Sequence, residues 1–382
     1  MTSVWPVLLK YLSRNVALIL LVSVFGEAAS IEKLEHGEGW SSDPVYDILT
    51  VGIDRCDIPR LEIPFECVYK LGGLLSRETE REDSGDETAV PSSATSPGCG
   101  RKELHGLDPH HPPSTPVVFS VSPPKLLEGE ENGASSKLPS FSDLTKKESL
   151  LKKYGDVEVI LSTANTFSHE KVKKSFREYV DVHVSAEAKR GKEGLVDSLL
   201  NTPATDVLYK FGDNYMGWED LLGKYERPQL YGGQEGALSF GVGGSGSGVP
   251  FHEHGAVFAE VFHGQKRWFF SPPDKEPQFE PDVTSFRWFH DHVQQSDKDG
   301  EAREETEGGM ERRRQVAVEG EANEKRDAEG EDKGSVREWS LRLPPGVTTC
   351  TCRPGGEILW IPDRWWHATL NVGETVFLSD FV

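Results

Sequence analysis

Short apolar stretches separated by glycine and proline run through the second half of the chain. Their β-branched and aromatic content predicts strands at 207–211, 237–242, 256–263, 267–271, 340–343, 357–361, 366–371 and 375–380. Many short strands with turn residues between them are typical of a sandwich or a closed barrel. We therefore expect an all-β core in this half of the chain.

The first half of the chain alternates between two periodicities. β-Branched residues predict strands at 116–121 and 156–163. Apolar residues at helical spacing predict a helix at 143–154, which Ser142 can cap. They predict a second helix after Ser168, which can cap it, with Val172, Phe176 and Tyr179 on one face. The expected fold class is mainly β with flanking helices, in which a small α/β N-terminal region precedes the β core.

Two polar stretches interrupt these patterns. Residues 71–115 are rich in Ser, Glu, Gly and Pro, and residues 294–337 contain 14 acidic and 9 basic side chains but no Leu, Ile or aromatic residue. Such segments bury too little apolar surface to offset the entropy of ordering them, so we predict disordered inserts. The rest is expected to form one domain, with an N-terminal segment at 29–70, an α/β support region at 116–235 and the β core at 236–382.

The first 28 residues have the features of a secretory signal peptide. Lys10 and Arg14 precede a mostly apolar run from Val16 to Phe25, and small residues follow it. This run of ten residues is too short to cross the hydrocarbon core of a membrane as a helix. We predict a cleaved signal at 1–28, no membrane span after its removal, and residence in the secretory pathway, in the lumen of the endoplasmic reticulum. An uncleaved anchor is the alternative.

Composition narrows the classes of function. The chain has 42 Lys+Arg against 63 Asp+Glu, a net charge of −21, and 36% hydrophobic residues. Proteins that bind the phosphate backbone normally present a basic face, so we expect no nucleic-acid partner. The low apolar content also excludes a polytopic membrane protein.

The cysteines are odd in number. The chain contains Cys56, Cys67, Cys99, Cys350 and Cys352. In an oxidising compartment at least one of the five stays free or pairs with another chain. A Cys56–Cys350 bridge is one of the pairings that the sequence allows. The Cys350-x-Cys352 pair lacks a second pair at metal spacing, so we do not expect a zinc ribbon.

The densest group of chemically active side chains is at 250–255. His252 and His254 lie two residues apart, so in an extended chain their side chains point to the same side. Two imidazoles at this spacing can chelate one metal ion. His367, before a predicted C-terminal strand, is a candidate third ligand. Three ligands on one side of a metal leave the opposite positions open for substrate and oxygen.

A second candidate is the lysine that follows. Gly264 suits a tight hairpin turn, and Lys266 is then expected to open the returning strand beside the metal site. An ammonium group there can pair with the carboxylate of an anionic co-substrate. A solvated lysine at a strand end is the alternative. Trp268 and the two phenylalanines after it are expected to pack in the core.

These motifs together resemble the JmjC (jumonji-C) domain of the cupin superfamily. Further stretches that carry the resemblance lie at 161–172, 208–214, 246–252 and 362–371. The resemblance covers roughly 50–70 and 116–382, apart from the acidic insert. It implies a double-stranded β-helix, or jelly-roll, with flanking helices at 236–382. Many members of the family are Fe(II)/2-oxoglutarate oxygenases that hydroxylate or demethylate proteins or nucleic acids.

The resemblance also implies roles for individual residues. His252 would be the first iron ligand and His367 the last, with His254 as the ligand between them. Lys266 would bind the distal carboxylate of 2-oxoglutarate. The expected cofactors are therefore Fe(II) and 2-oxoglutarate.

The chain departs from the family pattern at three positions. His254 stands where the pattern has Asp or Glu, and a neutral ligand compensates less of the charge of Fe(II), which favours zinc or copper. Val249 stands where many relatives place a Thr or Ser that helps to hold 2-oxoglutarate, and its side chain makes no hydrogen bond. Phe258 stands where many relatives have Asn.

Three hypotheses follow. The first is an oxygenase of the secretory pathway that hydroxylates a protein side chain. The second is a catalytically inactive JmjC protein that binds a protein partner or acts as an adaptor, since a fold does not fix a function. The third is a three-histidine cupin with other metal chemistry.

Overall fold

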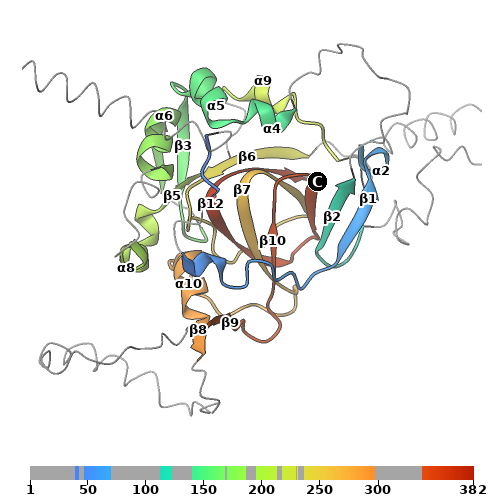
Figure 1. Cartoon of the computed structure of the whole chain (residues 1–382), viewed down its shortest axis with the longest axis vertical. Helices are drawn as coiled ribbons and strands as arrows, with labels where there is room; N and C mark the ends of the chain where they lie inside the picture. Colours follow the sequence, from blue (N-terminus) through green and yellow to red (C-terminus); the bar gives the residue numbers. More distant parts are fainter. Residues whose placement is uncertain are drawn as a thin grey trace, which may run out of the picture.

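The chain folds around a curled β-sheet, shown by the computed structural model in Figure 1. The structure describes residues 39–42, 47–69, 112–122, 140–167, 170–185, 195–212, 217–228, 230, 236–296 and 338–382. The predicted signal peptide at 1–28 and most of the two predicted inserts lie outside these residues. The proposed domain boundaries remain predictions.

Ten strands of the described residues join in one sheet in the order β1-β2-β11-β7-β12-β6-β5-β3-β4, with β10 paired to β7 beside this path. Their bounds are β1 Arg60–Pro64, β2 Val117–Ser122, β3 Glu158–Thr163, β4 Lys171–Ser175, β5 Leu208–Lys210, β6 Ala237–Gly243, β7 Val257–Ser271, β10 Thr348–Cys352, β11 Glu357–Ile361 and β12 Trp366–Phe381. A separate antiparallel pair consists of β8 Val293–Ser296 and β9 Glu338–Leu341. The predicted fold class, mainly β of the jelly-roll type with flanking helices, is confirmed.

Short helices surround the sheet. They are α2 Phe65–Tyr69, α4 Phe141–Leu144, α5 Lys147–Tyr154, α6 Phe176–Tyr179, α8 Leu195–Asn201, α9 Glu219–Leu222 and α10 Ser285–Asp291. In Figure 1, α4, α5 and α9 lie at one end of the curled sheet, and α10 lies with β8 and β9 at the opposite end. The largest apolar cluster packs α4, α5, α6 and α9 against the outer face of β3, β6, β7 and β12.

The two longest strands form the centre of the fold. β7 pairs with β12 along almost its whole length, while β11 and β10 pair with successive parts of its other edge. The strands predicted at 256–263 and 267–271 are continuous in β7, and those predicted at 366–371 and 375–380 are continuous in β12. Strand alternation along β7 and β12 therefore places one set of side chains inside the curl and the other under the helices.

The predicted hairpin turn at Gly264 is wrong. The chain does not reverse there, and β7 continues through Lys266 to Ser271. Gly264 has φ +68°, and a Cβ at this position would overlap the backbone carbonyl of Glu374 in the facing strand. The register of β12 against β7 also shifts just before and after Val376. The glycine therefore allows an irregularity in two close strands and does not make a turn.

The predicted helices are only partly right. Residues 171–175 form the edge strand β4, and the helix begins at Phe176 with Ser175 as its N-cap. The spacing of Val172, Phe176 and Tyr179 suggests a longer helix, but Val172 lies on β4 and only Phe176 and Tyr179 lie on α6. The helix predicted at 143–154 is divided into α4, capped by Ser140, and α5.

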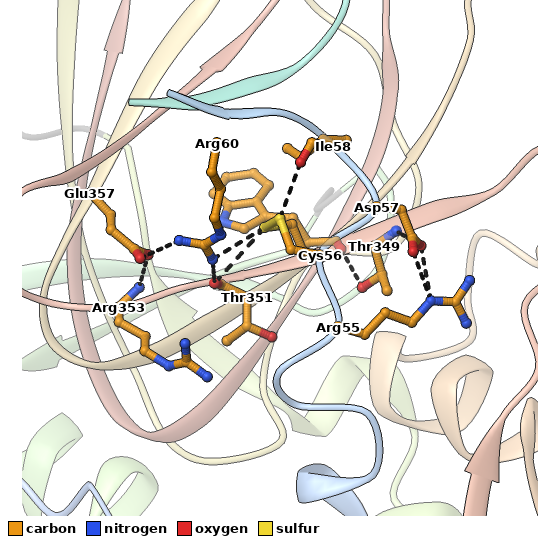
Figure 2. The surroundings of a disulfide bond; sticks show 11 residues. Arg55, Cys56, Asp57, Ile58, Arg60, Thr349, Thr351, Arg353 and Glu357 are labelled. Carbon is orange, nitrogen blue, oxygen red and sulfur yellow. Dashed lines mark hydrogen bonds and ion pairs between the residues drawn. A yellow bond between two sulfur atoms is a disulfide. The ribbon is translucent and has the colours of Figure 1, made fainter. Parts of the chain in front are cut away.

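The N-terminal segment is attached to the sheet covalently. Cys56 and Cys350 form a disulfide across 294 residues of sequence, one of the pairings that the sequence allowed (Figure 2). Beside it, the backbone N–H of Asp57 donates to the carbonyl of Thr349 at 2.8 Å, and the Asp57 carboxylate accepts from the N–H of Thr349 at 3.0 Å. The segment therefore covers the outer edge of β10. Within the described residues, Cys352 is a free, buried thiol.

Candidate metal centre

Two segments that are far apart in sequence bring three histidines together. His252 and His254 lie in the loop between β6 and β7, and His367 is the second residue of β12. The backbones of His252 and His367 exchange two hydrogen bonds, of 3.0 Å and 2.9 Å. The N–H of Arg364 donates to the carbonyl of His254 at 2.9 Å, and Arg364 has φ +61°. The histidine positions are therefore fixed by backbone contacts.

The backbone also selects the tautomer of each imidazole. The Nδ1 atoms of His252, His254 and His367 lie 2.9, 2.7 and 2.8 Å from backbone carbonyl oxygens. A carbonyl oxygen only accepts, so each Nδ1 carries the proton in the neutral ring. Each Nε2 therefore presents a lone pair. Second bonds of this kind are the usual way in which proteins orient metal-binding histidines.

The three lone pairs converge. The possible ligand atoms of the three histidines lie within 4.8 Å of one another, and Nε2 of His254 is 3.0 Å from Nε2 of His367. Two lone pairs at this distance repel each other unless a cation lies between them. Two nitrogen ligands about 2.1 Å from one ion and at a right angle lie about 3.0 Å apart. The three side chains therefore fit a metal ion.

The electrostatic surroundings keep these rings neutral. Burial lowers the pKa of His252 from its ordinary value of 6.5 to about 4. Burial, together with the two neighbouring histidines, lowers the pKa of His367 well below its ordinary range. The pKa of His254 is also lowered, mainly by burial. Since a metal binds the neutral imidazole, the site is prepared for a metal at neutral pH.

Lys266 lines the same pocket as the three histidines. Its ammonium donates to Oδ1 of Asn371 at 3.1 Å and lies 3.8 Å from the centre of the Phe377 ring. The side chain is buried, and this burial lowers its pKa from 10.5 to about 7. Lys266 is therefore not a solvated lysine at a strand end, but a buried cation beside the histidines.

Aromatic and apolar side chains form most of the pocket wall. The lining residues are Phe211, Val249, His252, His254, Val257, Lys266, Trp268, His367, Thr369, Phe377, Ser379 and Phe381. Phe258, one of the three departures from the family pattern, is absent from this lining. Its ring packs against that of Trp360, with the ring centres 4.8 Å apart. Its difference from the family pattern therefore does not alter the pocket.

Sequence reasoning missed several residues of the site. Thr369 Oγ1 accepts from the backbone N–H of Val249 at 3.0 Å, so a hydroxyl lies beside the valine that lacks one. Asn371 contacts Lys266, and Phe377 covers it. Counting by twos from His367 along the predicted strand reaches Thr369 and Asn371, and this signal could have found both.

The fold and the site define the class of the protein. It is a jelly-roll protein of the cupin type, with three histidines and a lysine gathered in one pocket. Within the described residues, no helix is both long and apolar enough to span a membrane.

Comparisons with known proteins identify the family. The chain is 35% identical over 266 residues to JmjC domain-containing protein 8 of Mus musculus, which covers 69% of this chain and 76% of the relative. The Homo sapiens protein of the same name is 35% identical over 266 residues, with 68% and 75% covered. No family model matches the chain. The chain belongs to the JmjC domain-containing protein 8 family.

Proposed function

We propose that this JmjC protein binds Fe(II) and 2-oxoglutarate and hydroxylates a protein side chain. The observation that carries the proposal is the convergence of three imidazole lone pairs and one buried ammonium in a single pocket. The histidines supply nitrogen ligands from one side, and Lys266 supplies the positive charge that a distal carboxylate requires.

Each side chain has a definite task in this proposal. His252, His254 and His367 would hold the metal through Nε2, with each ring oriented by the carbonyl bonded to its Nδ1. Bound Fe(II) supplies the redox chemistry with dioxygen. Lys266 binds the distal carboxylate, and Asn371 positions its ammonium. The apolar wall excludes water from the reacting groups.

The proposed location is the lumen of the endoplasmic reticulum, and the proposed partner or substrate is a protein of the secretory pathway. The apolar run from Val16 to Phe25 supports a signal peptide. The Cys56–Cys350 bridge supports an oxidising compartment, because disulfides are rare in the cytosol. Protection of the tagged full chain from protease in intact microsomes tests the location. Digestion without detergent would contradict it.

Metal content and 2-oxoglutarate turnover test the activity. The purified protein is loaded anaerobically with Fe(II), its bound metal is measured, and succinate release from 2-oxoglutarate is followed. His367→Ala should lose both metal and turnover. His290→Ala is a matched control, since His290 lies on α10 outside the pocket. Because turnover without the true substrate can be slow, binding of 2-oxoglutarate is measured in parallel. A wild-type protein that binds neither metal nor 2-oxoglutarate would refute the proposal.

Two observations favour a second candidate, an inactive JmjC protein that binds or recruits a protein partner. His254 is neutral where the family pattern has a carboxylate, and Val249 lines the pocket without a hydrogen-bonding side chain. A partner that binds the wild type and His367→Ala equally, without succinate release from either, would favour this candidate. Metal binding without 2-oxoglutarate binding would favour other metal chemistry at three histidines.

A further inference from the structure

An aromatic ring covers the cation that the proposed co-substrate must reach. The centre of the Phe377 ring lies 3.8 Å from Nζ of Lys266, and Trp268 lies at 5.5 Å. Asn371 Oδ1 accepts one of the three N–H bonds of the ammonium. An aromatic face attracts a cation, but it excludes an anion from the same side. As it stands, the ring therefore opposes the approach of a carboxylate to Lys266.

Neighbouring strands hold the ring in this position. Phe377 on β12 faces Gly241 on β6, and a Cβ at Gly241 would overlap the ring. The ring of Phe211 stacks against that of Phe377, with ring centres 5.6 Å apart and planes 26° apart. The ring therefore occupies a space that the absence of a side chain at Gly241 leaves open.

We propose that Phe377 determines the co-substrate specificity of the pocket by covering Lys266. This inference rests on the proposed function, because it concerns the same pocket and its 2-oxo acid. A five-carbon dicarboxylate must displace the ring before its distal carboxylate pairs with the ammonium. A 2-oxo acid with one carboxylate has no distal group, so its binding does not require this displacement. The ring therefore weakens the binding of 2-oxoglutarate relative to pyruvate.

Calorimetric titration of the full chain tests this inference. Protein loaded with Mn(II) is titrated with 2-oxoglutarate and with pyruvate under nitrogen. Phe377→Ala should bind 2-oxoglutarate at least tenfold more tightly than the wild type does and pyruvate less than threefold more tightly. In the double variant Phe377→Ala, Lys266→Met the gain for 2-oxoglutarate should disappear. Phe240→Ala is the matched control, because Phe240 is a fully buried ring on β6 that packs in the outer cluster.

Each outcome separates the inference from the proposed function. Equal 2-oxoglutarate affinity in the wild type and a folded Phe377→Ala variant would overturn the inference and leave the proposed function standing. The inference would also be overturned if Phe377→Ala still raised the affinity for 2-oxoglutarate in the absence of Lys266. A similar rise in affinity in Phe240→Ala would overturn it as well. If the Mn(II)-loaded wild type and the variants bind neither acid, the co-substrate part of the proposed function fails and the inference fails with it. Thermal unfolding of each variant establishes that it is folded.

Discussion

Replacing Lys266 with methionine should stabilise the metal-free protein at pH 6. Lys266 is 2% exposed, and the residues that line its pocket include no carboxylate. Burial lowers its pKa from 10.5 to about 7, so below pH 7 this side chain is a buried charge without a counter-ion among the residues that line the pocket. Methionine has a similar length and no charge, and it fills irregular apolar spaces well.

Two opposing effects set the change in the free energy of unfolding that Lys266→Met causes. One pKa unit corresponds to 1.36 kcal/mol, so the lowered pKa of Lys266 represents an upper limit of about 5 kcal/mol of unfavourable free energy at pH 6. Removing the ammonium also leaves Oδ1 of Asn371 without this donor, which costs about 1–3 kcal/mol. We therefore expect the free energy of unfolding to rise by about 2 kcal/mol at pH 6.

The sign of the pH dependence follows from proton linkage. Between pH 7 and 10.5 the unfolded lysine binds a proton that the folded one has lost, so wild-type stability rises with pH in this interval. The advantage of Lys266→Met should therefore shrink between pH 7 and 10, and the cost at Asn371 should remain.

Guanidinium unfolding at pH 6 and pH 9, with a chelator present and the disulfide intact, measures this difference. Lys147→Met is the matched control, because the Lys147 ammonium lies 2.9 Å from the buried carboxylate of Glu374. Breaking that pair should destabilise the protein by about 3 kcal/mol. The reasoning would be refuted if Lys266→Met were less stable than the wild type at pH 6. It would also be refuted if the difference in the free energy of unfolding between the two proteins did not change with pH.

Three further predictions concern the disulfide, the irregular strand and the histidines. Cys350→Ser should lower the free energy of unfolding by up to about 5 kcal/mol, because its bridge closes a long loop. Cys352→Ser should not have this effect, because Cys352 is a free thiol. Equal losses of stability in denaturant unfolding of the two variants would contradict this prediction. Gly264→Ala should lower the free energy of unfolding by more than about 2 kcal/mol, because its φ is positive and a Cβ would overlap the adjacent carbonyl. Gly255→Ala should be nearly neutral by the same measurement, because a Cβ there would have no atom within 4 Å. Zn(II) affinity should stay almost constant from pH 8 to 6 and fall towards pH 4, since the pKa values of the three histidines are lowered; a loss centred on pH 6.5 would contradict it.

Much of the fold could be predicted because most strands carry an apolar alternation. The strand β10, Thr348–Cys352, was missed because it alternates threonine with cysteine, which looks polar although four of its five residues are buried. The edge strand β4 is predicted as part of a helix because Val172, Phe176 and Tyr179 follow helical spacing, and the three lysines of β4 give it no apolar alternation. Edge strands tolerate such composition, and only their pairing partner identifies them.

The site could be predicted less completely than the fold. Spacing and the family resemblance identified His252, His254, His367 and Lys266, and the structure brings all four into one pocket. The ring over Lys266 could not be predicted, since its position depends on a glycine in another strand. Contacts between strands depend on register, which the sequence of one strand does not contain.

The charge balance of the pocket bears on the ligand that the proposed metal site would take. With three neutral imidazoles, a divalent metal ion keeps its full charge, and the pocket lining adds a lysine but no carboxylate. In the family pattern a carboxylate ligand compensates part of that charge, and His254 cannot. A dicarboxylate would supply two negative charges, one near the proposed metal and one near Lys266. Coupling between two ligands is reciprocal, so the anion strengthens metal binding by the same factor by which the metal strengthens anion binding. If the site holds Fe(II) as proposed, we therefore expect metal retention to depend on the anionic co-substrate, because His254 stands where the family pattern has a carboxylate.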